Sequence, residues 1–416
     1  MIPREIAAPS GLAPVFAASA LELASAGPGY DRTAEFLQRK LSGAFRHVGV
    51  TEADLGETTG YGYGDRGRRA LEEVFALAFD AEAALVRPHL VSGTQALSVA
   101  LFALLAPGDV LLSATGPPYD TLKPVIGPGP LSLEALGVRY REFDPWAGGT
   151  LDLAGLAAAA RAGAPRVVLV QRSRGYSVRP ALLQAKLEAL LEAIRDAAPR
   201  AAVVVDNCYS EFVEDREPAA LGADLSCGSL IKNPGGGLAP TGGYVAGRAQ
   251  LVDLVAGRLY APGLGREVGP SLVPIRLLLQ GLYLAPAAVA AALKVAEYAA
   301  SVFARLGYEV LPQPGDERGD IVQAIRLGSR RRVESFCAAI QSMSPVDSRA
   351  TPEFAALPGY QHQVIMAAGT FVQGASLELS ADAPDREPYW VFLQGGLGLG
   401  YGMAAVEAAA AAVGPR

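Results

Sequence analysis

The sequence predicts an α/β protein with a mostly parallel sheet covered by helices, followed by a smaller α+β domain. Three observations lead to this prediction. The middle of the 416-residue chain alternates short β-rich runs with longer helical patterns. These short runs are continuously apolar, as expected for strands that are buried on both faces. From about Gly307 the alternation stops, and strand and helix patterns follow in a different order.

The elements expected in the large domain follow from this alternation. The expected strands are Ala84–Val91, Val110–Ala114, Arg139–Phe143, Val167–Gln171, Ala202–Asp206 and Gly243–Ala246. The helices expected between them are Arg68–Phe79, Thr94–Leu105, Leu153–Ala162 and Leu182–Ala197. Sheets of this kind bind their ligands at the C-terminal ends of the strands, so functional residues are expected there.

We divide the chain into three parts. Residues 1–60 form an N-terminal segment with a helix near Asp31–Phe45, expected to pack on the small domain or on a partner subunit. Residues 61–285 form the large domain. Residues 286–416 begin with a bridging helix, Pro286–Arg305, and continue into the small domain. The elements expected there are strands Tyr308–Leu311, Ile321–Leu327, Gly374–Leu379 and Trp390–Gln394, and helices Arg331–Gln341 and Leu397–Val413.

Composition excludes several classes of function. A net charge of −6 and a pI near 5.3 argue against a nucleic-acid or anionic-membrane partner. The three cysteines, Cys208, Cys227 and Cys337, have no paired spacing, which argues against disulfides and fits a reducing cytoplasm. The three histidines are scattered, so no metal site is expected.

Two segments invite a targeting or membrane interpretation. Residues 1–19 contain Arg4, Glu5 and three prolines, so we do not expect a signal peptide. The apolar tract from Leu282 to Phe303 is interrupted by Pro286, Lys294 and Glu297, so we expect a buried or interface helix rather than a membrane span.

Lys232 lies in a loop of small residues with no charged neighbour between Asp224 and Arg248. A buried amine loses hydration, so we expect a lowered pKa and a nucleophilic Lys232. Such an amine can form a Schiff base with an aldehyde such as pyridoxal phosphate (PLP). The alternative is an incidental lysine in a Gly-rich turn. Ser229, three residues earlier, could donate to a phosphate, and Gly235–Gly237 would let the chain pass close to a cofactor or a subunit boundary.

A second candidate segment runs from Ser92 to Gln95 and joins a strand to a helix. Gly93 permits a tight turn, and the N–H groups of Gly93, Thr94 and Gln95 would point out of the helix N-terminus toward an anion. The Thr94 hydroxyl adds a donor. The alternative is ordinary helix capping by Ser92 or Thr94.

Two further candidates follow strands. Asp206 ends an apolar strand 26 residues before Lys232, where its carboxylate could hold the proton of a pyridine nitrogen. Asp206 could instead cap a helix. Tyr119, in a Pro-rich loop after the strand Val110–Ala114, could lie on a pyridine ring or pack on that loop. In their order and spacing, these residues together resemble the set found in fold-type I PLP enzymes.

Long segments of the chain resemble the methionine gamma-lyase family, also known as aluminium-resistance or cystathionine beta-lyase-like proteins. The similar segments, which extend from about residue 30 to residue 400, are Thr58–Asp65, Ala83–Pro88, Ser92–Thr94, Gln171–Tyr176, Val205–Tyr209, Gly228–Gly237, Ile365–Phe371, Ser376–Asp382 and Gln394–Gly396. The resemblance implies a fold-type I PLP-dependent transferase-like fold with a sheet of the seven-stranded type, and PLP bound by the large domain.

The resemblance also implies a reaction and an assembly. Such enzymes cleave C–S bonds of sulfur-containing amino acids by β- or γ-elimination, giving a thiol, ammonia and a 2-oxo acid. Tyr61 and Tyr63 match tyrosines that hold the phosphate of a neighbouring subunit's PLP, with Arg66 or Arg68 as a basic partner. A homodimer or homotetramer with the active site at the subunit interface is therefore expected.

A substrate carboxylate requires a bidentate arginine. Arg386 lies where the relatives place theirs, and Arg172 and Arg174 compete because they follow the strand before Asp206. Arg386 could instead be a solvated side chain beside acidic residues.

In the expected mechanism Lys232 removes the α-proton and Tyr119 or Tyr61 protonates the leaving group. The alternatives are a PLP enzyme of another reaction type, such as an aminotransferase or an aldolase-like enzyme, and a non-catalytic PLP-binding protein.

Overall fold

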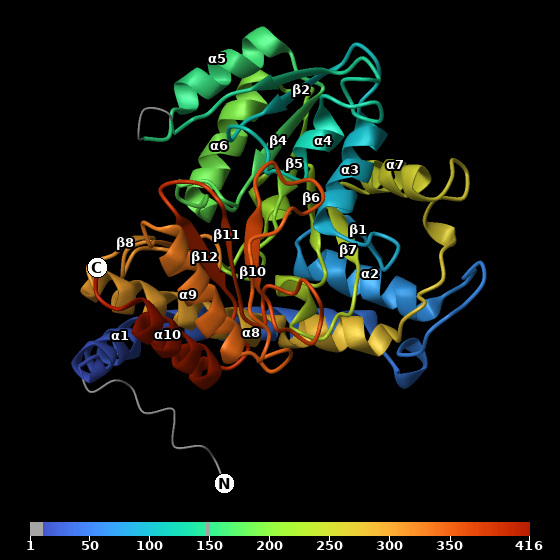
Figure 1. The fold of residues 1–416 in the computed structure, drawn as a ribbon. Helices are drawn as coiled ribbons and strands as arrows, with labels where there is room; N and C mark the ends of the chain where they lie inside the picture. The colour runs from blue at the N-terminus through green and yellow to red at the C-terminus, as the bar shows by residue number, and fades with distance from the viewer. Residues whose placement is uncertain (1–10, 147–149) are drawn as a thin grey trace.

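The computed structural model describes residues 11–146 and 150–416, so the first ten residues of the expected N-terminal segment lie outside the described part. The large domain holds a seven-stranded sheet of order β1-β7-β6-β5-β4-β2-β3 (Figure 1). Strand β7 is antiparallel to both of its neighbours, and the other pairs are parallel. The sheet strands are β1 (Ala83–Arg87), β2 (Val110–Ser113), β3 (Arg139–Glu142), β4 (Val167–Gln171), β5 (Ala202–Asp206), β6 (Leu225–Ser229) and β7 (Gly243–Gly247).

Apolar residues on both faces of the sheet explain why helices cover both. Helices α3 (Gly93–Leu104) and α7 (Ala249–Leu259) pack on one face through residues such as Leu97 and Val252. Helices α5 (Leu153–Gly163) and α6 (Gln184–Ala197) cover Val168 and Val203 on the other face. The remaining helices of this domain are α2 (Arg66–Ala78) and the short α4 (Lys123–Ile126).

The small domain contains a five-stranded antiparallel sheet of order β10-β11-β12-β9-β8. Its elements are β8 (Glu309–Leu311), β9 (Gln323–Arg326), α9 (Arg330–Ser342), β10 (Val364–Ala367), β11 (Ser380–Pro384), β12 (Trp390–Gln394) and α10 (Leu399–Val413). The prediction of a strand over Gly374–Leu379 is wrong. The Glu378 carboxylate accepts hydrogen bonds from the N–H groups of Phe371 and Val372, which folds this segment into turns, and the strand starts at Ser380.

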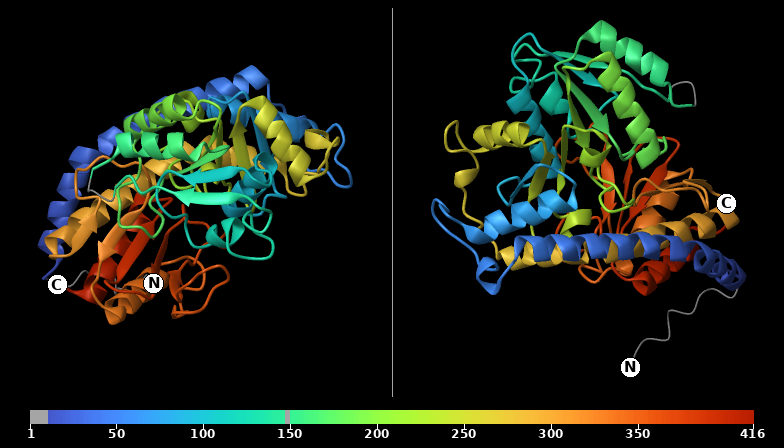
Figure 2. Two further views of the ribbon diagram at one scale, coloured as in Figure 1. Left: turned by 90° about the horizontal axis from the view of Figure 1, so that it is seen from above. Right: turned by 180° about the vertical axis from the view of Figure 1, so that it is seen from behind.

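Two long helices lie side by side behind both sheets (Figure 2). Helix α1 (Ala13–Val48) is longer than the expected Asp31–Phe45 and contains Pro28. Helix α8 (Ile275–Arg305) begins 11 residues before the expected Pro286, which it contains. Helix α8 is long and apolar enough to cross a membrane by length and composition, but 67% of its most apolar window is buried inside the protein. Packing against α1 and both domains accounts for this apolar character.

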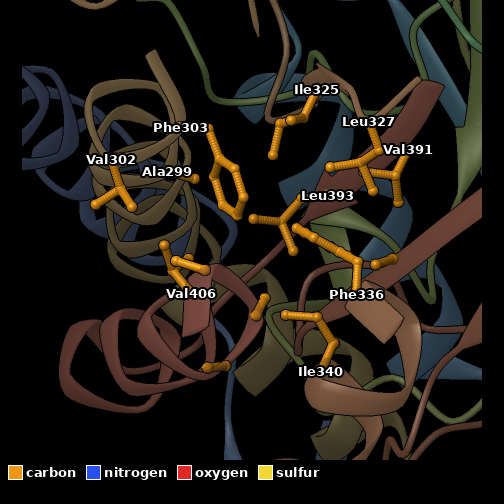
Figure 3. Close-up of a cluster of buried hydrophobic side chains, with 14 of the residues drawn as sticks. Ala299, Val302, Phe303, Ile325, Leu327, Phe336, Ile340, Val391, Leu393 and Val406 are labelled. Atoms are coloured by element: carbon orange, nitrogen blue, oxygen red, sulfur yellow. The ribbon is translucent and has the colours of Figure 1, made fainter. Parts of the chain in front are cut away.

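The core of the small domain lies between its sheet and helices α8, α9 and α10. Figure 3 shows Phe303 of α8 among Leu393 of β12, Phe336 of α9 and Val406 of α10. The Phe303 and Phe336 ring centroids are 5.5 Å apart. Phe303 is 0% exposed, so its side chain contributes its full apolar area to this core.

Replacing Phe303 with alanine is expected to lower the free energy of unfolding by about 3–5 kcal/mol, because it leaves a cavity among side chains from three helices and a sheet. Denaturant unfolding measures the change. Leu131→Ala is the control, since Leu131 is 88% exposed and its loss should change the free energy by less than about 0.5 kcal/mol. Equal effects of the two substitutions would contradict the assignment of this core.

Candidate active site

A cavity of about 320 Å³ lies at the C-terminal ends of β4, β5 and β6 and is closed by the small domain. Seven of the residues singled out in the sequence line it: Ser92, Gly93, Thr94, Tyr119, Asp206, Ser229 and Lys232. Parallel pairing explains the gathering, because it places Asp206 at the end of β5 beside Gln171 of β4 and Cys227 of β6. The small domain supplies a second wall, which includes Ser376, Asp382 and Gln394.

The Lys232 amine lies 3.8 Å from the centre of the Tyr209 ring. Burial alone would lower the pKa of Lys232, but the acidic groups of Cys208, Tyr209 and Asp206 raise it well above its usual range. Burial also raises the pKa values of the Cys208 thiol and the Tyr209 phenol, so both stay protonated at neutral pH. Asp206 is the carboxylate among these acidic neighbours. The prediction of a lowered pKa is wrong, because Cys208, Tyr209 and Asp206 lie near the amine in space and are not its neighbours in the sequence.

Asp206 is 4% exposed and accepts a hydrogen bond from the Cys208 N–H at 3.1 Å. Burial raises the pKa of Asp206, and the Lys232 charge opposes that change. The residue thus faces a cation across the cavity instead of capping a helix. A carboxylate in this position can keep a proton on a neighbouring basic nitrogen.

The N-terminus of α3 forms a small cradle. A Cβ on Gly93 would lie 2.9 Å from the Cys208 sulfur and 3.5 Å from the Ser229 Cβ, so glycine is required for this close approach. The N–H groups of Gly93 and Thr94 belong to the first turn and have no partner within the helix. Ser92 caps the helix by accepting from the Gln95 N–H at 3.1 Å. These donors fit an anion.

Gln95 is placed differently from the expectation. Its N–H donates to Ser92, and its side-chain oxygen accepts from the Val91 N–H at 2.8 Å. Neither group therefore faces the anion site.

Tyr119 lines the cavity, and its hydroxyl lies 3.1 Å from the Thr94 hydroxyl oxygen, which also lies 3.1 Å from that of Thr121. Burial raises the pKa of Tyr119 well above its usual value, so the phenol is protonated at neutral pH. Tyr119 is therefore available as a proton donor in this wall. The expected stacking of its ring on a pyridine stays a prediction.

None of the three arginines expected to bind a carboxylate lines the cavity. Arg172 is 0% exposed and bonds Glu214 at 2.6 Å and Asn207 at 3.2 Å. Arg174 pairs with Asp320 at 3.4 Å. Arg386 is exposed and donates to the Tyr176 carbonyl oxygen at 2.9 Å, outside the wall that Tyr176 forms. Arg172 and Arg174 thus form structural pairs.

Tyr61 and Tyr63 lie outside this cavity, on an exposed loop. They are 77% and 65% exposed, and their rings stack with centroids 5.6 Å apart. Arg68 is buried and holds the loop, because it donates to the carbonyl oxygens of Gly62 and Gly269, both at 2.6 Å. Arg68 is therefore not free to bind a phosphate, whereas Arg66 pairs with Asp54 near the surface.

The glycines after Lys232 approach a helix and not the cavity. Gly236 has φ of 55°, and a Cβ there would lie 2.1 Å from the Gly281 carbonyl oxygen of α8. A Cβ on Gly281 would in turn lie 2.2 Å from the Gly235 carbonyl oxygen. The expected close approach to a cofactor or subunit boundary is therefore a backbone contact between the Lys232 loop and α8.

The sequence did not single out several lining residues, namely Tyr176, Tyr209, Tyr360, Ser376, Asp382 and Gln394. All but Tyr360 lie in segments that carry the family resemblance. Tyr209 has φ of 73°, which is unusual for a residue with a side chain and marks a constrained position. The segments were thus visible in the sequence, but the roles of these residues were not.

Glu211 lies behind this wall, and its burial leads us to expect that the free energy of unfolding depends on pH. Burial raises its pKa to about 8, and its Oε2 has no hydrogen-bond partner among the described residues. The folded state holds a proton that the unfolded state releases near its ordinary value of 4.5, so stability falls as pH rises from there toward 8. The contribution to the slope is at most about 1.4 kcal/mol per pH unit.

Glu211→Gln should therefore flatten the decline of the unfolding free energy between about pH 5 and 8. Denaturant unfolding at several pH values measures it, with the exposed Glu192→Gln as control. Parallel curves for wild type and Glu211→Gln would show that Glu211 does not hold this proton.

The family model for methionine gamma-lyase matches residues 16–413. The chain belongs to the methionine gamma-lyase family. A protein from Listeria monocytogenes, proposed to be a cystathionine beta-lyase involved in aluminium resistance, is 42% identical, with a TM-score of 0.92 over 96% of this chain and 99% of that one. The carbon-sulfur lyase involved in aluminium resistance from Clostridium novyi is 38% identical, with a TM-score of 0.93 over 98% and 97%.

Two further comparisons extend this family assignment. The uncharacterized protein YnbB of Bacillus subtilis is 44% identical over 85% of each chain. The pyridoxal-5'-phosphate-dependent protein YhfS from Escherichia coli, 21% identical with a TM-score of 0.59 over 89% of this chain and 94% of that one, shares the fold. The expected type I fold is thus confirmed.

The cavity of this methionine gamma-lyase family member fits PLP. The anion cradle at Gly93, Thr94 and Ser229 suits a phosphate, Lys232 supplies an amine, and Asp206 supplies a carboxylate. Gly93 leaves space where any side chain would meet Cys208. The match to PLP depends on the whole set of these groups and not on any single residue.

Proposed function

We propose that the chain is a PLP-dependent carbon–sulfur lyase that acts on a sulfur-containing amino acid by β- or γ-elimination. The observation that carries the proposal is that Asp206 at the end of β5 and Lys232 in the loop after β6 line one cavity beside an anion cradle. When bound, PLP supplies an electron sink for the α-carbon of an amino acid. Family membership supports the same reaction class.

The chain's own residues have distinct parts in this proposal. The N–H groups of Gly93 and Thr94 and the Ser229 hydroxyl bind the phosphate and orient the ring. Asp206 keeps the proton on the ring nitrogen. Lys232 is the base that removes the substrate's α-proton, and Tyr119 is the acid that protonates the departing thiolate. A β-elimination then converts the amino acid and one water into a thiol, ammonia and a 2-oxo acid.

We also propose a homodimer or homotetramer in the cytoplasm. Tyr61 and Tyr63 are exposed on a loop that Arg68 holds in place, which supports a role at a neighbouring subunit's phosphate and leaves Tyr61 as a second candidate acid. Sedimentation of the wild type tests the assembly, and a monomer at catalytic concentration would overturn it.

The test of the reaction uses purified protein loaded with PLP. Cystathionine, cysteine, methionine, O-acetylserine and O-acetylhomoserine are supplied one at a time, and thiol and 2-oxo acid are measured. We expect at least one sulfur substrate to give thiol and 2-oxo acid in equal amounts. Product formation only with an added 2-oxo acid and no thiol would indicate an aminotransferase. No turnover with bound PLP would indicate a non-catalytic PLP-binding protein.

A further inference from the structure

The sheet of the small domain turns a polar face toward the cavity. Alternate residues of β11 and β12, such as Ala381 and Leu393, enter the core shared with α8, α9 and α10. Ser380, Asp382 and Gln394 lie on the opposite face and line the cavity. Ser380 and Gln394 are register partners, and the Gln394 amide donates to the Asp382 carboxylate at 3.0 Å. The polar residues of two strands therefore form one patch.

Two polar atoms in or beside this patch lack a hydrogen-bond partner among the described residues. The Ser376 hydroxyl and the Gln394 side-chain oxygen are buried, with no hydrogen-bond partner among the described residues, although both residues line the cavity and are 4% exposed. The two residues are neighbours, because a Cβ on Gly395 would lie 2.2 Å from the Ser376 carbonyl oxygen. Buried polar atoms are normally hydrogen-bonded, so unpartnered atoms facing a cavity indicate a ligand that fills their hydrogen-bonding capacity.

The charges around the cavity restrict that ligand. Among the described lining residues Lys232 is basic, against three carboxylates, those of Asp120, Asp206 and Asp382. Asp120 pairs with Lys123 at 2.8 Å, and Asp206 faces Lys232. The neighbours that hydrogen-bond Asp382 are Tyr176 and Gln394, which carry no charge. Burial raises the pKa of Asp382 to about 6, although hydrogen bonding by Tyr176 and the Lys232 charge oppose the rise, so its carboxylate is ionised at neutral pH. It forms no salt bridge with a cation among the described residues.

We propose that Asp382, Gln394 and Ser376 form a subsite for a protonated amine at the far end of the substrate's side chain. The inference rests on the proposed function and narrows its substrate class to amino acids with a second ammonium group. An ammonium has three donors and no acceptor, which matches a carboxylate oxygen, an amide oxygen and a hydroxyl oxygen. The rings of Tyr176 and Tyr360, whose centroids are 6.2 Å apart, border the same space and favour a cation. A terminal carboxylate would be repelled by Asp382.

Binding of unreactive amino acids tests the subsite without the elimination reaction. L-lysine carries the second amine, and L-norleucine has a chain of similar shape without it. Calorimetric titration of the PLP-loaded protein is expected to show at least about tenfold tighter binding of L-lysine. Asp382→Asn should remove this preference and change L-norleucine affinity less than about twofold. Equal affinities in the wild type, or a preference that survives Asp382→Asn, would overturn the subsite.

Ser376→Ala is the second variant and covers the case in which Asp382→Asn does not fold. It removes one unpartnered acceptor and should weaken L-lysine binding about threefold or more, with L-norleucine unaffected. Unchanged L-lysine binding in this variant would also overturn the subsite. The titration and the assay of thiol release together separate the two proposals. A preference for L-lysine without thiol release refutes only the lyase activity, and thiol release without this preference refutes only the subsite.

Discussion

Replacing Lys232 with alanine is expected to remove the absorbance near ~420 nm that a lysine-bound pyridoxal gives, and to lower the elimination rate by about a thousandfold or more. Lys232 is the basic residue lining the described cavity, so no neighbouring amine can replace it as the tether or as the base. Absorbance spectra of protein purified with PLP and the initial rate of 2-oxo acid release measure both effects.

Lys186→Ala is the matched control, since Lys186 is exposed on α6 and lies outside the cavity. It should keep both the absorbance and the rate. A Lys232→Ala protein that retains the band would show that another lysine anchors the cofactor, and the assignment of the cavity would be wrong.

Replacing Asp206 with asparagine is expected to lower kcat about 10²- to 10³-fold while the lysine-bound absorbance remains. The amide can still accept the hydrogen bond from the Cys208 N–H, so the local fold is kept, but it carries no charge to hold a proton on the ring nitrogen. Asp206 is also one of the acidic groups that raise the pKa of Lys232. The absorbance band should therefore change with pH over a lower range than in the wild type.

The control for this substitution is Asp109→Asn, a half-buried turn residue outside the cavity whose side chain accepts from the Ala106 N–H at 2.8 Å. It should leave kcat unchanged. Wild-type kcat in Asp206→Asn would remove the carboxylate from the proposed mechanism, and loss of both kcat and absorbance would show that Asp206 is needed to retain the cofactor.

Sequence reasoning found the strand ends that build the cavity, because a polar residue after an apolar strand is recognisable without coordinates. Asp206, at the end of β5, is of this kind. Sequence reasoning missed strand β6, because Leu225–Ser229 contains two serines and a glycine and is not an apolar run. Pairing with β5 and β7 stabilises this strand. Whether such a segment forms a strand depends on the neighbouring strands of the sheet.

The charged residues were harder to place, because their partners lie far away along the chain. Arg174 was a candidate for substrate binding, yet its partner Asp320 is 146 residues away, and that of Arg172 is 42 residues away. The direction of the Lys232 pKa was missed for the same reason. Asp382 and Gln394 lay in recognisable segments, but only strand pairing shows that they share one face.

The backbone contact between Gly236 and Gly281 has a consequence for how this protein can vary. Both sides of the contact are main chain, so a methyl group added at either position cannot be compensated by trimming a side chain at the other. The contact therefore holds the loop that carries Lys232 against α8, although the two glycines are 45 residues apart in the sequence. Both positions must therefore stay glycine in any redesign of the cavity.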